Sequence, residues 1–341
     1  MRETLLGKTP EELKEVALKV GLPPFAGKQI AGWLYGRRVQ DIDLMTNISK
    51  LGRDRLKEEY DLGVTPPSTC QVSRDGTKKY LFPLGGGNAV EAVMIPDDDR
   101  KTLCVSSQAG CRMGCKFCMT GRQGFHGQLS AAGILSQFVS IDEAPDLTNA
   151  VFMGMGEPLD NFDNVLRAIE VLTSDWGFAW SPKRITLSTI GVIPNLRRYL
   201  DLTRCHLAVS LHTPFPDERA QLMPVQKAWP LEDVIDLLHG YDFSGQRRVS
   251  FEYTMFAGLN DDKRHADALI RLLKGLECRV NLIRFHRIPD APFEPSPQVI
   301  MENFRDRLSN HGITCTIRAS RGEDIMAACG MLAGEHRKKS D

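Results

Sequence analysis

The chain has 341 residues, of which 42% are apolar and 25% are charged. This composition suffices for one large domain with a full core plus a smaller accessory domain, and it excludes an intrinsically disordered chain. Lysine and arginine together number 43, as do aspartate and glutamate. The overall charge therefore favours neither a nucleic acid nor an acidic membrane surface, and a site for a polyanion must come from a local patch.

The N-terminal segment MRETLLGKTPEEL lacks the apolar core of a signal peptide. Nowhere do about 18 consecutive apolar residues predict a membrane span, so we expect a cytoplasmic protein without a membrane partner. Three of the nine cysteines lie within eight residues. This distribution favours metal binding or catalytic thiols in a reducing compartment over a disulfide framework.

Residues 1–62 are predicted to form a small helical accessory domain. Thr9, Pro10 and Glu12 supply an N-cap, a proline at the first helical position and a capping-box partner for the first helix. Further helices are expected around residues 28–38 and 49–60. Gly63 and the prolines at 66–67 then predict a boundary. On charge alone, the mixed charge of this domain favours a solvated surface over RNA binding.

From Thr69 onward the pattern changes to short strands. Turn residues at 75–76 and 85–88 separate β-rich segments, so residues 63–97 are expected to form a β-meander. In residues 98–334, helical stretches alternate with six strand-like runs: TLCVSS, NAVFMG, RITLST, HLAVSL, RVSFEYTMF and RVNLIRF. The predicted fold is therefore α/β, a partial (β/α)6 barrel followed by a charged tail at 335–341.

The run CRMGCKFC places Cys111, Cys115 and Cys118 in a short loop after the first barrel strand. Three thiolates can converge there on one metal centre. A [4Fe-4S] cluster with three cysteine ligands keeps one iron open for a substrate, whereas a structural cluster usually has four. Zinc with Cys104 as fourth ligand is the alternative, although zinc sites usually pair their cysteines in two separated knuckles.

The spacing of these cysteines, with Phe117 before the last, resembles that of the radical S-adenosylmethionine superfamily. Nearly the whole chain is similar to one branch of it, the bacterial ribosomal and transfer RNA adenosine C2-methyltransferases. The segments that carry this resemblance are FAGKQIAGWLY, MTNISK, TLCVSSQAGC, GMGEPLDN, AVSLH and RGEDIMAACG. The resemblance implies that the amino acid end of S-adenosylmethionine occupies the open iron.

The same resemblance implies a set of cofactor contacts at the ends of the barrel strands, where such folds build active sites. Gly156 and Glu157 would hold the methionine amino group, since glycine admits close approach and a carboxylate accepts from an ammonium. The other implied contacts are Ser188, Ser210, Leu211, His212 and His286. At the last position we expect asparagine in many relatives, so only a carbonyl or imidazole contact is proposed. Read alone, these residues equally suit a tight turn and ordinary strand-end polarity.

Two further cysteines and one carboxylate complete the implied mechanism, which uses two molecules of S-adenosylmethionine per turnover. Cys329 would take a methyl group by displacement and become S-methylcysteine. A 5′-deoxyadenosyl radical from the second molecule would remove hydrogen from that methyl group, and the carbon radical would add to adenine. Glu91 would accept the proton, and Cys104 would release the product through a transient disulfide with Cys329. Read alone, Cys104 suits a small buried hydrophobe and Glu91 an exposed strand residue.

The implied substrates are an adenosine in the peptidyl-transferase centre of 23S rRNA and one adjacent to the anticodon in tRNA, with flavodoxin or ferredoxin as electron donor. Two other functions stay open: an adenosine C8-methyltransferase of 23S rRNA that confers antibiotic resistance and, more remotely, a zinc-binding RNA module. Candidate RNA contacts are Arg112, Lys116, Arg122, His126, Lys183, Arg184, Arg197 and Arg198. The remaining cysteines, at positions 70, 205, 278 and 315, are interpreted as structural.

Overall fold

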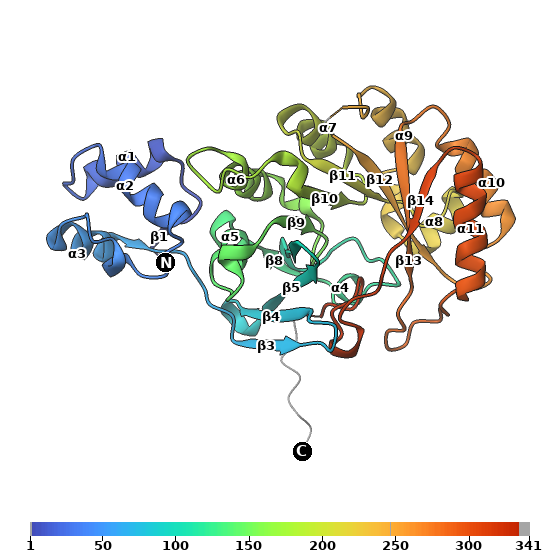
Figure 1. Cartoon of the computed structure of the whole chain (residues 1–341), viewed down its shortest axis with the longest axis horizontal. Coiled ribbons are helices and arrows are strands. Elements are labelled where there is room, and N and C mark those ends of the chain that lie inside the picture. Colours follow the sequence, from blue (N-terminus) through green and yellow to red (C-terminus); the bar gives the residue numbers. More distant parts are fainter. Residues whose placement is uncertain (1, 246, 334–341) are drawn as a thin grey trace, which may run out of the picture.

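The fold is built on one mixed sheet of ten strands in the order β14-β13-β12-β11-β10-β9-β6-β5-β4-β3 (Figure 1). The computed structural model describes residues 2–245 and 247–333. The strands that run parallel are β6 (Arg100–Cys104), β9 (Asn149–Phe152), β10 (Ile185–Thr189), β11 (His206–Ser210), β12 (Val249–Met255), β13 (Cys278–Arg284) and β14 (Thr314–Ile317). Because β14 and β3 are the two edges, the described strands do not close into a ring.

The predicted α/β class and all six predicted barrel strands are confirmed. The sequence did not reveal β14, whose four residues carry only one buried side chain, that of Cys315. Its place in the sheet depends on pairing with β13, where Val280 lies opposite Cys315. Polar and apolar residues alternate in this edge strand, but four residues are too short a run to predict a strand from.

Helices alternate with the parallel strands, as the predicted βα rhythm requires. They are α4 (Met119–Arg122), α5 (Ala131–Val139), α6 (Phe162–Thr173), α7 (Ile193–Leu202), α8 (Pro216–Leu222), α9 (Leu231–His239), α10 (Lys263–Leu272) and α11 (Gln298–Asn310). Each longer helix turns an apolar face to the sheet; in α6 that face includes Val165, Ile169 and Leu172. No helix in the described part of the chain has both the length and the apolar character of a membrane span.

The N-terminal elements stand to one side of the sheet (Figure 1). They are α1 (Pro10–Lys19), α2 (Ala26–Ala31), α3 (Lys50–Glu59) and a two-stranded parallel pair, β1 (Glu3–Thr4) with β2 (Tyr60–Asp61). The predicted capping box is present, because Glu12 N donates to Thr9 Oγ1 at 3.2 Å and Thr9 N donates to Glu12 Oε2 at 2.6 Å. The second helix differs from prediction: it begins at Ala26 and changes to a π-helical turn over Gly32–Gly36.

The predicted meander is formed by β3 (Thr69–Val72), β4 (Lys78–Pro83) and β5 (Ala89–Asp97), which pair antiparallel. At the predicted turn, Asp75 Oδ1 accepts a hydrogen bond from Thr77 N at 2.9 Å, and Gly76 has a φ of +83°. The meander is continuous with the main sheet, since β5 also pairs with β6. A separate small sheet, β7 (Gln108–Gly110) with β8 (Phe125–Gln128), frames the cysteine loop.

Candidate active site

The cysteine loop begins where β7 ends and returns through α4 to β8. Gly110 starts it with a φ of +69°, and a Cβ there would lie 1.9 Å from the carbonyl oxygen of Gly124, so only glycine fits. Cys111 N donates to that same oxygen at 2.8 Å. Inside the loop, Cys118 N donates to Cys115 O at 3.3 Å. The tight turn therefore brings all three thiols to the wall of one cavity of about 160 Å³.

The chemistry of this wall suits an iron-sulfur cluster. Burial raises the pKa of Cys111 to about 12 and that of Cys115 well above the ordinary range. Such thiols ionise only beside a strong positive charge, which bound iron supplies. Within residues 2–245 and 247–333, no three histidine, cysteine or carboxylate side chains are gathered closely enough to hold a single metal ion. A cubane instead takes each cysteine on a separate iron.

The GMGE segment after β9 lies across the same cavity in a conformation that demands glycine. A Cβ on Gly154 would lie 2.7 Å from Val105 O, and Gly156 has a φ of +99° with Gln108 against its missing side chain. Gln108 Oε1 also accepts a hydrogen bond from Glu157 N at 2.8 Å. These two glycines therefore let the backbone pass close to the segment 105–108, which leads into the cysteine loop, and turn Glu157 inward.

Glu157 is buried and fully engaged by hydrogen-bond donors. Its Oε1 accepts from Thr189 Oγ1 at 2.6 Å and from Leu159 N at 3.0 Å, and its Oε2 accepts from Ile190 N at 2.9 Å. Burial raises the pKa of this carboxyl to about 7, although these three donors oppose the rise. Because its pKa lies close to neutral pH, a cationic ligand beside this buried carboxyl would stabilise its ionised form.

Ser188 ends the inner face of β10, and Ser210 and Leu211 end β11. Both serines line the 160 Å³ cavity, whereas the side chain of Leu211 is fully buried. Arg219, which the sequence analysis missed, holds these strand ends in place. It is completely buried in α8, where it donates to Ser210 O at 2.9 Å, to Ile190 O at 3.2 Å and to Leu211 O at 3.3 Å. No local pattern identifies it, because all of these acceptors are backbone carbonyls.

His212 takes the left-handed conformation, with a φ of 60°, and lines the same cavity. Its Nδ1 accepts from Thr254 N at 2.9 Å. Burial and the charge of Arg219 lower its pKa to about 3. The ring is therefore neutral with its proton on Nε2. Phe117 from the cysteine loop meets this ring edge-on, at 4.7 Å between centroids.

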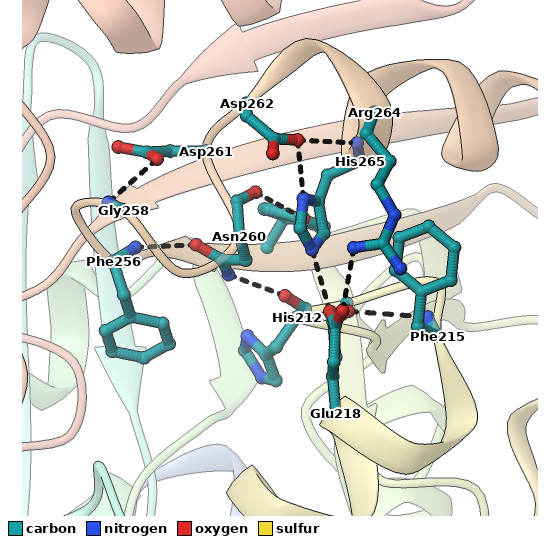
Figure 2. A network of polar contacts seen from close by, with 12 residues as sticks. His212, Phe215, Glu218, Phe256, Gly258, Asn260, Asp261, Asp262, Arg264 and His265 are labelled. Atoms are coloured by element: carbon teal, nitrogen blue, oxygen red, sulfur yellow. Dashed lines mark hydrogen bonds and ion pairs between the residues drawn. The ribbon is translucent and has the colours of Figure 1, made fainter.

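Asn260 fixes the unusual backbone of His212 from behind (Figure 2). Its Nδ2 donates to His212 O at 2.7 Å and to Thr254 O at 2.8 Å, and its Oδ1 accepts from Phe256 N at 2.7 Å. Asn260 is fully buried. Both N–H donors of the amide and its oxygen are thus used to hold the ends of β11 and β12.

A further set of polar contacts stabilises the loop that carries Asn260 (Figure 2). His265 at the start of α10 lies between two carboxylates, with Nδ1 2.7 Å from Asp262 Oδ1 and Nε2 2.7 Å from Glu218 Oε2. Arg264 pairs with the other oxygen of Glu218 at 2.9 Å. Since Glu218 belongs to α8, the same helix that carries Arg219, this network ties two helices to the cavity wall.

A larger cavity of about 430 Å³ meets the first one at Cys118 and Cys329, which line both. Cys104, at the end of β6, lines only the larger cavity. The segment that carries Cys329 is docked on the cysteine loop, since Met119 N donates to Gly330 O at 2.8 Å. The structure thus brings both extra cysteines to one space, and it places Cys329 between that space and the cysteine loop.

All nine cysteines are free thiols. Removal from water, together with the negative charge of an ionised Cys329, raises the pKa of Cys104 to about 12. Removal of its sulfur from water also raises the pKa of Cys329, although the residue as a whole is exposed, whereas Arg318 lowers the pKa of both thiols. Arg318 itself pairs with Glu252 at 3.4 Å. Of the four cysteines interpreted as structural, Cys205 and Cys315 are buried, the one at 278 is half-buried and the one at 70 is exposed on β3.

Glu91 and His286 lie apart from the cysteine loop. Glu91 is buried rather than exposed and lines a third cavity, where it pairs with Lys79 at 3.0 Å and accepts from Ala333 N at 2.8 Å. His286 lines the larger cavity and uses both ring nitrogens within the protein, with Ser320 at 3.0 Å and Glu323 at 3.3 Å. A contact from the His286 carbonyl stays a prediction.

Comparison with known proteins agrees along almost the whole chain. Residues 105–269 match the Radical SAM superfamily, and residues 4–62 match the ribosomal RNA large subunit methyltransferase N-terminal domain. The chain is 61% identical to a probable dual-specificity RNA methyltransferase RlmN of Porphyromonas gingivalis over 99% of this chain and 98% of that protein. It is 45% identical to the dual-specificity RNA methyltransferase RlmN of Halorhodospira halophila, covering 98% and 94%.

One solved structure shares the complete fold. A radical SAM methyltransferase from Sphaerobacter thermophilus superposes with a TM-score of 0.93 at 37% sequence identity, over 98% of this chain and 100% of that one. The match extends through the N-terminal elements, the meander and the parallel strands alike.

Proposed function

Because this chain belongs to the RlmN family of dual-specificity RNA methyltransferases, within the radical SAM superfamily, we propose that it methylates C2 of an adenosine in 23S rRNA and in tRNA. The rRNA target is the peptidyl-transferase centre, and the tRNA target lies adjacent to the anticodon. The observation that carries the proposal is the position of Cys329 where the cysteine-loop cavity opens into the cavity of Cys104. A methyl group on the Cys329 sulfur would lie between the cysteine-loop cavity, where the radical is generated, and the cavity of Cys104, which would receive the RNA base.

The cysteine-loop cavity holds the cofactors. Cys111, Cys115 and Cys118 would ligate three irons of a [4Fe-4S] cluster, and Gly156 and Glu157 would receive the amino group of S-adenosylmethionine. Ser188, Ser210 and His212 line the remaining wall. The bound cluster and S-adenosylmethionine supply a 5′-deoxyadenosyl radical. The chain itself orients the cofactor, and the neutral His212 offers an Nε2–H as a hydrogen-bond donor.

Cys329 acts first as a nucleophile. Its thiolate takes a methyl group from one S-adenosylmethionine, so a carbon–sulfur bond forms and S-adenosylhomocysteine leaves. A hydrogen atom is then removed from this methyl group, and the resulting carbon radical adds to C2 of adenine. This route has a physical reason, because C2 is too poor a nucleophile to attack a sulfonium methyl directly.

Glu91 and Cys104 act in release. Glu91 takes the C2 proton, and the one electron that the adduct must lose to restore the aromatic ring would pass to the bound iron-sulfur cluster. Cys104 then attacks the Cys329 sulfur, the methylene–sulfur bond breaks, the released carbon takes a proton, and a disulfide remains. A two-electron reductant must return that disulfide to thiols. Since Ala333 N now occupies Glu91 Oε2, this step requires the 326–333 segment to move.

The proposal includes three further assignments. An electron donor such as flavodoxin or ferredoxin serves the cluster, and the enzyme works in the cytoplasm, where its RNA substrates and reduced thiols occur. Residues 1–62 form an RNA-binding accessory domain, 63–97 a linker and 98–334 the catalytic core. The last residue of that core and the tail at 335–341 lie outside the described residues.

Product analysis tests the function directly. The anaerobically reconstituted enzyme is incubated with S-adenosylmethionine and unmodified 23S rRNA or tRNA, and the digested nucleosides are separated by mass spectrometry. The expected product is 2-methyladenosine. Formation of 8-methyladenosine would instead establish the alternative C8 activity, and an unreactive, zinc-containing protein would establish the RNA-binding module.

The affinity for S-adenosylmethionine should depend on pH through Glu157. The neutral carboxyl form, which predominates below the pKa of about 7, is a weaker acceptor for the N–H groups of the ligand's amino group than the carboxylate is. We therefore expect binding to weaken roughly fivefold to tenfold between pH 7.5 and pH 6. Anaerobic equilibrium dialysis measures this change. Glu157→Gln should bind more weakly at pH 7.5 and lose the dependence; an equal dependence in that variant would contradict the role of Glu157.

Asn260 should affect cofactor binding without touching the cofactor. Asn260→Ala removes three buried hydrogen bonds, which should lower the free energy of unfolding by about 3 kcal/mol. Relaxation of the left-handed His212 backbone should also weaken S-adenosylmethionine binding about tenfold. Asn47→Ala is the control for loss of an amide away from the site, because Asn47 is exposed and bonds Trp33 Nε1 at 2.5 Å in the N-terminal region. If Asn260→Ala loses stability but retains cofactor affinity, Asn260 has only a structural role.

A further inference from the structure

The larger cavity is strongly cationic in a chain whose formal net charge is zero. Seven lysine and arginine residues line it, against one carboxylate, that of Asp97. Two of the seven, Arg100 and Arg321, share that carboxylate at the open edge beside β5. Arg318 pairs with Glu252, as described above, and Arg284 is bonded to Gln298. A concentration of one sign of charge in a cleft attracts a polyanion.

The uncompensated charges gather at the end of the cavity opposite the cysteine loop. Lys183 and Arg184 immediately precede β10, Arg248 immediately precedes β12, and all three are exposed and line the cavity. In the described part of the chain, no carboxylate lies within ion-pair distance of any of them. Arg248 donates instead to His206 Nε2 at 3.3 Å, at the start of β11.

The basic side chains at this end of the cavity, the rim, also repel one another. The pKa of the buried His206 is lowered to about 4, mainly by burial but also by the fields of Arg248, Lys183 and Arg279. The partial loss of hydration and the charge of Arg279 likewise lower the pKa of Arg248. Three cations, Lys183 and Arg248 from the segments before β10 and β12 and Arg279 from β13, thus surround one neutral histidine. Because these basic side chains repel one another, a bound anion would stabilise them, and the folded chain does not supply that anion itself.

Three other basic residues, Arg112, Arg122 and Arg198, differ from these, although the sequence makes them equal candidates. Arg112 pairs with Asp160 at 2.9 Å and stacks on Phe125, at 3.9 Å from the ring centroid. Arg122 donates to the carbonyl of Pro289. Arg198, on α7, pairs with Asp163 at 3.0 Å. These arginines have partners within the protein, so they are poorer anchors for phosphate groups.

The distance across the cavity matches a short stretch of single-stranded RNA. Lys183 and Arg184 precede β10, which rises roughly 13 Å from Ile185 to Thr189 at about 3.3 Å per residue. Cys104, Cys118 and Cys329 lie at the far end. When the target base reaches these thiols, the phosphates of its flanking nucleotides therefore lie near the rim.

From this arrangement we propose that the substrate RNA enters the barrel at the amino ends of β10, β11 and β12, with its phosphates on Lys183, Arg184, Arg248 and Arg279. The target base passes along the larger cavity to Cys104 and Cys329, opposite the side on which the cofactors bind. This inference rests on the proposed function for the identity of the polyanion. It assigns the entry side and the anchoring residues.

Two neutral double variants test the entry side. Lys183→Gln/Arg184→Gln removes two exposed rim charges, and Arg271→Gln/Lys274→Gln removes two exposed charges at the outer end of α10. Binding of a fluorescent substrate stem-loop is measured by anisotropy at several salt concentrations. The rim variant should lose about tenfold in affinity, and the slope of log K against log salt should fall by about 1.4, at about 0.7 per lost single-strand phosphate contact. The α10 variant should match the wild type.

Cys329 methylation without RNA reports on the integrity of both variants, and it should stay at the wild-type level. Should the rim variant fail to fold, protection of Lys183 against acetylation by bound RNA in the wild type decides the question, with Lys274 as the unprotected reference. Unchanged affinity and slope in a folded rim variant, or no protection of Lys183, would overturn the proposal. Because binding is measured separately from the modified nucleoside, failure of the proposed function alone would leave these results intact.

Discussion

Cys329→Ala is expected to abolish methylation of both protein and RNA, with a loss of about 10⁴-fold or more in the RNA product. Cys329 is the thiol that lines both cavities and lies outside the cluster motif. Without its sulfur no methyl group is held between the radical source and the base. Intact-protein mass spectrometry after incubation with S-adenosylmethionine measures the first loss, and nucleoside analysis measures the second.

Cys70→Ala is the matched control, since Cys70 is an exposed thiol on the edge strand β3. It should retain both activities. Cleavage of S-adenosylmethionine to 5′-deoxyadenosine should also persist in Cys329→Ala, because the cysteine loop is unchanged. RNA methylation by Cys329→Ala at a substantial rate would remove the carrier thiol from the mechanism.

Cys104→Ala is expected to leave Cys329 methylation intact but to trap a covalent protein–RNA adduct, with turnover reduced about 10³-fold or more. The physical reason is that Cys104 lines the cavity with Cys329, and no other described cysteine outside the cluster motif does so. Without it nothing attacks the Cys329 sulfur to release the methylated base. A denaturing gel with end-labelled RNA should show a slow band that protease removes.

The control for this variant is Cys315→Ala, which alters a comparably buried thiol on β14. It should form product without an adduct. Free 2-methyladenosine released by Cys104→Ala at the wild-type rate would eliminate the resolving role, whereas loss of Cys329 methylation in this variant would indicate a general disturbance of the site.

Much of the fold follows from local patterns in the sequence. The capping box at Thr9 and Glu12, the turn at Asp75 and the six barrel strands all depend on residues within a few positions of one another. The elements that were missed depend on distant partners: β1 exists because it pairs with β2, and β14 because it pairs with β13. The π-helical turn after α2 begins and ends in glycine, which weakens the regular helix expected there.

The residues of the candidate site also fall into two groups, those that local sequence predicts and those that depend on distant partners. The spacing of Cys111, Cys115 and Cys118 and the glycines of GMGE are local, and the structure gathers them around one cavity. Arg219 and Asn260 were not recognised, because they act on backbone carbonyls supplied by other elements and leave no motif. Glu91 was expected to be exposed when read alone, and its burial follows from the packing of the C-terminal segment over β5.

Charge was the least informative feature of the sequence. Arg112, Arg198 and Lys183 were equivalent candidates for RNA contacts until their carboxylate neighbours were located. Those neighbours are Asp160 and Asp163 for the two arginines, and no described carboxylate for Lys183. A balanced overall charge therefore conceals a cationic interior, because ion pairing is a property of the folded arrangement rather than of composition.

The measurement that tests the central claim most directly uses S-adenosylmethionine with a trideuterated methyl group, under anaerobic conditions with unmodified RNA. Transfer through a methyl radical on Cys329 predicts 5′-deoxyadenosine carrying one deuterium and 2-methyladenosine whose methyl group keeps two. The third hydrogen of that methyl group should come from the solvent. A product methyl group that retains all three deuterium atoms would show direct transfer from the sulfonium and would contradict the account.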